Sequence, residues 1–226
     1  MGLDMYLNKM PRHGNATVND VVNIENYIDY IESVKNPDSK AREYTMEEWC
    51  GIKENDVPTD LLEFYRQFYT KKYYLWDTDH EYGHDRIMEQ VAYWRKANHI
   101  HSWFVEHVQD GEDDCCYHNE VTKEILEDLL CTCNLVINNS KLVKGKIING
   151  YTFENGKETP VFEDGEYIED SNVAMEVLPT ASGFFFGSTD YDEWYYEDVK
   201  YTAETIRKIL DTTDFDKEMI YYISSW

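Results

Sequence analysis

Basic residues are scarce in this chain. Its 226 residues include 21 lysines and arginines but 45 aspartates and glutamates, which gives a formal net charge of −24 at pH 7. Proteins that hold nucleic acid by general attraction neutralise phosphate groups with lysine and arginine. The charge excludes that class, so we expect no direct binding of nucleic acid. The partners that fit are cations, the basic surface of another protein, or a small anionic ligand held by a local basic pocket.

Long apolar runs and a disulfide pattern are missing as well. The first residues, MGLDMYLNKMPRHG, lack the apolar core of a signal peptide, and no segment approaches the length of a membrane span. The five cysteines are odd in number and include the adjacent Cys115 and Cys116, which does not indicate a disulfide framework. We expect a cytoplasmic protein with reduced thiols that does not contact a membrane.

The residues that are present suffice for one folded domain with a real core. Hydrophobic residues make up 42% of the chain and aromatic residues 15%, and tyrosine occurs 19 times. Leu3, Met5 and Leu7 alternate with more polar residues, and this period of two predicts a strand. The segments with strand character are residues 3–8, 147–153, 182–188 and 218–226.

Helical spacing of apolar residues marks most of the remaining chain. The predicted helices cover residues 19–36, 58–69, 122–137 and 202–210, and residues 79–108 fit one long helix or two with a break. Asn19 and Thr122 are candidate N-caps. The helix at 122–137 is expected to turn Leu126, Leu129, Cys133 and Val136 inward.

These elements predict an α+β fold. We expect residues 1–226 to form a single domain, in which the N- and C-terminal strands pair in a small, mostly antiparallel sheet. Several amphipathic helices would pack against this sheet, with residues 9–86 as a more variable helical elaboration.

The segment HEYGH, residues 80–84, has the H-E-x-x-H spacing of zinc hydrolases. On a helix, His80 and His84 lie one turn apart and can bind zinc, while Glu81 can act as general base on the metal-bound water. The alternative is a capping box formed by Thr78 and Glu81, which places the segment at a helix start. We favour the capped helix, and therefore expect no cofactor, with zinc as the alternative.

The segment YWRKANHIHSWF, residues 93–104, gathers cationic, amide and aromatic groups in an otherwise acidic chain. Such groups can hold an anionic or nucleotide-like ligand by charge-assisted hydrogen bonds and stacking. The candidate ligand-binding residues are Trp94, Arg95, Lys96, Asn98 and His101. Alternatively, Arg95 and Lys96 pair with carboxylates of the C-terminal half and fix a helix to the sheet.

Residues 187–201, GSTDYDEWYYEDVKY, interleave carboxylates with aromatic rings, and the chain from Glu154 to Lys200 holds thirteen acids but two lysines. Carboxylates on an aromatic base can imitate nucleic-acid phosphates toward a basic protein surface. The candidate protein-binding residues are Asp190, Tyr191, Asp192, Glu193 and Trp194. A solvated acidic loop over an aromatic core is the alternative.

Four segments resemble a family of accessory proteins from bacteriophages and prophages. They are MGLDMYL, AYWRKANHIHSWFVEHVQDGEDDC, LPTASGFFFGSTDYDEWYYEDV and the closing YYISSW. The resemblance covers both ends and the centre of the chain and leaves out residues 9–86. It implies a phage context and a location in the cytoplasm of the bacterial host cell, but it supplies no activity. Small non-structural phage proteins often act on host machinery or host defence.

We therefore predict a non-enzymatic phage accessory protein that binds and modulates a host factor, for example in counter-defence, through its acidic, tyrosine-rich surface. One alternative is the sequestration of a small anionic or nucleotide ligand by residues 93–104. The other is a zinc-dependent hydrolase built on residues 80–84.

Overall fold

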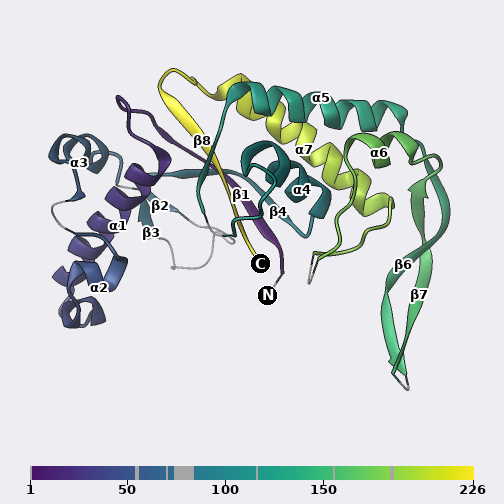
Figure 1. The fold of residues 1–226 in the computed structure, drawn as a ribbon, viewed down its shortest axis with the longest axis horizontal. Coiled ribbons are helices and arrows are strands. Elements are labelled where there is room, and N and C mark those ends of the chain that lie inside the picture. Colours follow the sequence, from purple (N-terminus) through teal and green to yellow (C-terminus); the bar gives the residue numbers. More distant parts are fainter. Residues whose placement is uncertain are drawn as a thin grey trace.

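The two ends of the chain lie side by side in one sheet. The computed structural model describes residues 2–53, 56–69, 71–73, 84–115, 117–154, 156–183 and 186–226. Strands β1 (Asp4–Pro11) and β8 (Glu218–Ser225) are antiparallel neighbours. Strand β4 (Glu89–Arg95) pairs with the other edge of β1, and β5 (Asn119–Val121) pairs with the other edge of β8. The strand order is therefore β4-β1-β8-β5 (Figure 1). The predicted pairing of the terminal strands in a small antiparallel sheet is confirmed.

One face of this sheet is covered by α4 (Asn98–Val108), α5 (Lys123–Asn139) and α7 (Glu193–Thr212), with the short α6 (Asn172–Val177) beside α5. Leu7, Trp94 and Tyr222 from three neighbouring strands are buried in this layer. Helix α5 begins at the predicted cap, where the Thr122 hydroxyl accepts a hydrogen bond from the Ile125 amide at 3.4 Å. Its four predicted inward residues are all fully buried.

The opposite face is covered by helices from the chain between β1 and β4. Helices α1 (Val18–Lys35) and α3 (Thr59–Arg66) form a second apolar cluster with Met10, Met219 and Tyr221 of the sheet. The short η1 (Lys40–Glu43) and α2 (Met46–Cys50) adjoin α1, and a ribbon of β2 (Lys71–Tyr73) and β3 (His84–Arg86) completes this region (Figure 1). The molecule is thus an α+β domain with helices on both faces of its sheet.

A long β-hairpin projects from the body of the molecule (Figure 1). It consists of β6 (Leu142–Glu154) and β7 (Lys157–Ile168), which pair with each other and with no other strand among the described residues. The base of the hairpin is tied to the segment before α7, because the Ile168 amide donates to the Tyr191 carbonyl at 2.9 Å. An isolated bridge between Tyr167 and Asp192 adds to this connection. The hairpin therefore meets the body beside Tyr191 and Asp192, within the acidic stretch of residues 187–201.

Residues 84–95 were predicted to be helical, and this prediction is wrong. They form β3 and β4, and the helix begins only at Asn98. In β4 the buried Ala92 and Trp94 alternate with the more exposed Val91 and Tyr93, so the same apolar residues fit a period of two. Pairing with β1 supplies the hydrogen bonds that decide between the two periods.

Three smaller predictions also need correction. Helix α1 is capped by Thr17 and not by Asn19, because Thr17 and Asp20 form a reciprocal capping box. The described residues of 182–188 form no strand. The predicted helix at 202–210 is the second half of α7, which begins at Glu193 and takes in much of the expected acidic loop.

None of the helices in the described part of the chain combines the length and apolar character that a membrane span requires.

Candidate functional site

A pocket of about 480 Å³ lies where the end of β4 and the start of α4 meet the start of α7 and part of β6. It brings together two segments that the sequence indicated separately, residues 93–104 and 187–201. Arg95 and Lys96 line one part of its wall. The carboxylates that line it are Asp190, Asp192, Glu197 and Asp198. The pocket therefore carries groups of both charges.

The corner between β4 and α4 has a constrained backbone. Lys96 has a φ of 62°, in the left-handed region that residues other than glycine rarely adopt. Its amide donates to the Leu3 carbonyl at 2.8 Å, and a Cβ added at Gly187 would lie 2.9 Å from the Lys96 carbonyl oxygen. These contacts hold Lys96 in place. The exposed side chains of Arg95 and Lys96 form no ion pair within the described residues, so the alternative that they fix helix to sheet has no support there.

Asn98 was predicted to bind a ligand, but its side chain binds the protein itself. The residue is 1% exposed, and its amide nitrogen donates to the carbonyls of Phe186 and Ser188 at 3.1 and 2.7 Å. Its amide oxygen accepts from the Ala181 amide at 2.9 Å. Asn98 therefore fastens the backbone of Ala181, Phe186 and Ser188 to the start of α4, and although it lines the pocket its amide is already engaged.

Trp94 is also a structural residue. Its ring is buried in the core, and its Nε1–H donates to the Thr202 hydroxyl of α7 at 2.9 Å. A buried indole needs such a partner for its polar nitrogen. Trp94 does not line the pocket, so of the five predicted ligand-binding residues only Arg95, Lys96 and Asn98 do.

His101 lies away from the pocket, in a buried hydrogen-bonded cluster. Its Nδ1 is 2.7 Å from the Tyr222 hydroxyl, and its Nε2 is 3.0 Å from Oδ2 of Asp113. With His101 2% exposed and Tyr222 fully buried, the pair has no open face toward a ligand. The arrangement joins α4 to β8 and to the loop after α4.

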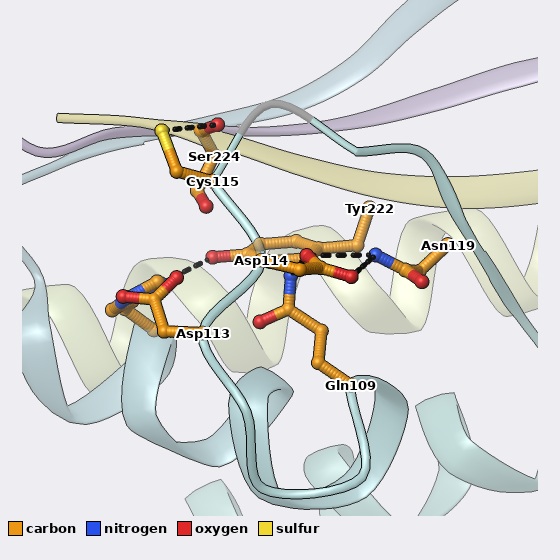
Figure 2. Close-up of polar contacts among 8 residues, drawn as sticks. Gln109, Asp113, Asp114, Cys115, Asn119, Tyr222 and Ser224 are labelled. Atoms are coloured by element: carbon orange, nitrogen blue, oxygen red, sulfur yellow. Dashed lines mark hydrogen bonds and ion pairs between the residues drawn. The ribbon is translucent and has the colours of Figure 1, made fainter.

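That loop is organised, in its described residues 109–115, by its own polar side chains and by Asn119 at the start of β5. The Asn119 amide donates to both carboxylate oxygens of Asp114 at 3.1 and 2.9 Å, and the Gln109 amide donates to the same carboxylate. Figure 2 shows the Asp114 carboxylate between the side chains of Asn119 and Gln109. The Cys115 thiol lies 3.9 Å from the Ser224 carbonyl of β8. These contacts close the loop over the end of the sheet.

The acidic wall of the pocket is built on the N-terminus of α7. Asp192 caps this helix, with Oδ1 accepting from the Trp194 and Tyr195 amides at 3.0 and 3.1 Å. Its Oδ2 is buried and has no hydrogen-bond partner among the described residues. Burial raises the pKa of Asp192. Burial, together with the charge of Asp192, raises the pKa of Asp198 to about 7.

His99 belongs to the pocket wall and was not predicted from the sequence. It is 3% exposed, and its ring packs against that of Tyr195 with centroids 4.3 Å apart. Burial lowers the pKa of His99 to about 3, so the imidazole is neutral at pH 7. Its Nε2 has no hydrogen-bond partner among the described residues. No spacing marks His99, because residues 98–101 are all buried irrespective of helix face.

Asp198 was missed too, although a signal existed. The buried face of α7 includes Tyr195, Val199 and Thr202. A residue three positions after Tyr195 and four before Thr202 lies beside that face. The sequence could therefore have shown that the Asp198 carboxylate is partly withdrawn from water.

The five predicted protein-binding residues differ in exposure. Trp194 is 65% exposed, whereas Tyr191 is partly buried, with its hydroxyl accepting from the Thr180 amide at 3.2 Å. Glu193 packs over β7, where its Oε1 would lie 3.0 Å from a Cβ added at Gly165. Two exposed aromatic residues of the hairpin, Phe162 and Tyr167, were not predicted. They line a groove of about 330 Å³ at the hairpin base, together with Asp190, Tyr191 and Asp192.

The proposed zinc motif lies mostly outside the described residues, because His80, Glu81 and the candidate cap Thr78 all fall in residues 74–83. The described part begins with His84, whose backbone opens strand β3 and not a helix. Within the described ranges no three His, Cys, Asp or Glu residues gather closely enough to hold a metal ion.

The pocket and the groove share Ile148, Asp190 and Asp192, so they form adjoining depressions on one side of the hairpin base. Their combination of exposed rings, carboxylates and two cations is suited to binding, through stacking and charge-assisted hydrogen bonds. Comparison with protein-family models, curated proteins and solved structures gives no match.

Proposed function

We propose that this protein is a phage accessory protein that acts by binding, without catalysis, to the basic surface of a host protein. The binding surface consists of Phe162, Tyr167, Asp190 and Trp194, and we name it the acidic–aromatic surface. The observation that carries the proposal is the exposure of these rings: Phe162 is 57%, Tyr167 41% and Trp194 65% exposed. Large exposed rings at a groove are typical of protein-binding sites, where they supply most of the binding energy.

Charge favours a basic partner. From Glu169 to Asp198 the chain has eight aspartates and glutamates and no lysine or arginine. Lys146, which lines the groove, is already engaged with Asp164 at 2.7 Å, and Lys200 of α7 is engaged with Glu197 at 2.9 Å. A lysine- or arginine-rich surface would gain both attraction to the carboxylates and stacking of its cations on the rings.

To find the partner, the chain is immobilised and the proteins that it retains from a bacterial lysate are identified. The partner is then purified, and its affinity for this protein is measured directly. Binding should weaken between 50 and 300 mM salt, because screening shortens the reach of the carboxylates. Replacement of Phe162 and Trp194 by serine should weaken binding by about thirtyfold or more, the cost of losing about 2 kcal/mol at a central contact.

A matched control is Trp49→Ser. Trp49 is 45% exposed on α2, on the other side of the sheet from α7, and its loss should leave the affinity unchanged. Equal affinity of the Phe162/Trp194 variant and the parent chain, or a partner that binds equally at both salt concentrations, would refute the proposal. Asp192 is left intact because it caps α7.

A further inference from the structure

The charges in the pocket are arranged in two groups. Arg95 and Lys96 come from the β4–α4 corner, and neither forms an ion pair within the described residues. Asp190, Asp192 and Asp198 come from the opposite segment, before and within α7. A wholly anionic ligand, such as the nucleotide that residues 93–104 were predicted to bind, would meet these carboxylates as well as the two cations. A ligand with both charges would suit both groups.

Two buried polar atoms at the pocket have no hydrogen-bond partner among the described residues. They are Oδ2 of Asp192 and Nε2 of His99, and both residues are at least nine-tenths buried and line the pocket. A buried polar atom without a hydrogen bond costs free energy, which a ligand that supplies the bond can recover. The Asp192 oxygen can only accept from a donor such as an ammonium N–H, unless the carboxyl is protonated. The neutral imidazole of His99 can donate or accept, according to its tautomer.

The remaining walls are compatible with a small organic ligand. The part of β6 that lines the pocket, Ile148 to Gly150, contributes no titratable group, and Trp194 stands at the same pocket with its exposed ring. A volume of about 480 Å³ lies within the range of small-molecule sites. Because no three potential ligands of a metal ion gather in the described residues, an organic cation fits the carboxylates better than a metal ion does.

We infer that this pocket binds a small zwitterion of the amino-acid type. The ammonium group lies against Asp192 and Asp198, and the carboxylate lies against Arg95 and Lys96. The site shares Asp190 and Trp194 with the acidic–aromatic surface, but Phe162 and Tyr167 of the hairpin line the groove and not this pocket.

Proton release is a signature of this arrangement. Burial and the charge of Asp192 raise the pKa of Asp198, and burial raises that of Asp192. An ammonium group placed beside them favours the ionised carboxylates and lowers both pKa values. The other titratable groups that line the pocket are Arg95 and Lys96 from the β4–α4 corner, His99 from α4, Asp190, and Tyr195 and Glu197 from α7. Binding near pH 6.5 should therefore release protons.

Thermal-shift measurements with each of the twenty standard amino acids test the inference, followed by calorimetry of any that bind. For leucine, the matched compounds are isoamylamine, which has only the amine, and 4-methylpentanoate, which has only the carboxylate; every other binder is compared with its own matched pair. The intact amino acid should bind at least about tenfold more tightly than either half, because each half leaves one charged group of the pocket without its counterpart. Calorimetry in buffers of different ionisation enthalpy at pH 6.5 should show protons released.

Two variants test the positions of the charges. Asp192→Asn keeps a capping acceptor for α7 but removes the charge, and Arg95→Gln removes a cation; each should weaken binding by about tenfold or more. Glu204→Gln, an exposed residue of α7 outside the pocket, and Phe162→Ser on the hairpin should both bind as the parent chain does. The inference is overturned if no amino acid stabilises the protein, if the carboxylate-only compound binds equally well, or if Asp192→Asn has no effect. Phe162→Ser also separates this site from the proposed protein-binding surface, which that substitution should damage.

Discussion

Replacement of His99 by glutamine should make the stability of the protein less sensitive to acid. His99 is buried in the pocket wall, and burial lowers its pKa from 6.5 to about 3. In the unfolded chain the imidazole is exposed and returns to its ordinary pKa. Between these two pKa values the unfolded state binds a proton that the folded state does not, so acid favours unfolding.

The size of this effect follows from the two pKa values. The stability that His99 contributes is fully present above pH 6.5 and is lost as the pH falls toward 3. Between pH 8 and pH 5 the loss amounts to about 2 kcal/mol, and it approaches about 5 kcal/mol below pH 3. Glutamine carries no titratable group, so the variant lacks this loss whatever its absolute stability.

Denaturant unfolding of both proteins at pH 8, 6.5 and 5, followed by tryptophan fluorescence, measures the difference in their free energies of unfolding. The advantage of the parent chain over His99→Gln should shrink by about 2 kcal/mol from pH 8 to pH 5. His107→Gln, an exposed position in the last turn of the same helix, is the control. A His99→Gln variant whose stability falls with acid as steeply as that of the parent chain would refute the description of His99 as a buried neutral group.

Asp198→Asn should stabilise the protein at pH 8 by about 1–2 kcal/mol, after allowance for partial exposure, and most of this gain should be lost at pH 4, close to the ordinary pKa of the carboxyl. The pH dependence has the opposite sign to that of His99. A carboxyl with a raised pKa contributes stability that is present at low pH and is lost as the pH rises through about 7. Urea unfolding at the two pH values measures the difference in the free energy of unfolding between the variant and the parent chain. Asn98→Ala should cost about 2–4 kcal/mol through the loss of three hydrogen bonds, and limited proteolysis should then cleave within residues 181–188 sooner than in the parent chain. Elemental analysis of protein purified without chelators should find no stoichiometric zinc if Glu81 belongs to a capping box. In that case Thr78→Ala should lower the free energy of unfolding, measured in urea, by about 1 kcal/mol. About one zinc per chain, lost in His84→Ala, would instead establish the metal site.

Much of the fold could be predicted from local patterns. Leu3, Met5 and Leu7 alternate clearly, and the helix after Thr122 shows both its cap and its buried face. In each case one period fits the apolar residues and the other does not. The prediction of a helix at residues 84–95 failed because two spacings fit the same apolar residues. Val91 and Trp94 have the spacing of one helix face, whereas Ala92 and Trp94 have the alternation of a strand. Only the partner strand, β1, resolves that ambiguity, and local sequence does not show which strand will be adjacent.

The candidate site was harder to predict, because its two halves are far apart along the chain. Arg95 and Asp192 each belong to a segment of unusual composition, and nothing in either segment indicates that they share a pocket. The connection is made by Asn98, whose side chain forms hydrogen bonds with the backbone of Ala181, Phe186 and Ser188. The composition of residues 93–104 predicted that this amide binds a ligand, whereas in the fold its three hydrogen bonds are all made within the protein.

The change of backbone direction at Lys96 explains why the predicted ligand-binding group was divided. If residues 93–104 were a continuous helix, Arg95, Lys96, Asn98 and His101 would occupy adjoining faces and could converge on one ligand. The left-handed conformation of Lys96 ends the strand and starts the helix in a new direction. Arg95 and Lys96 therefore remain at the pocket, while His101 is directed to Tyr222 and Asp113 in the interior. Arg95 and Lys96 therefore share their pocket with carboxylates such as Asp198, and not with the imidazole of His101. Because both charges line the pocket, a ligand that carries both charges suits it better than an anion does.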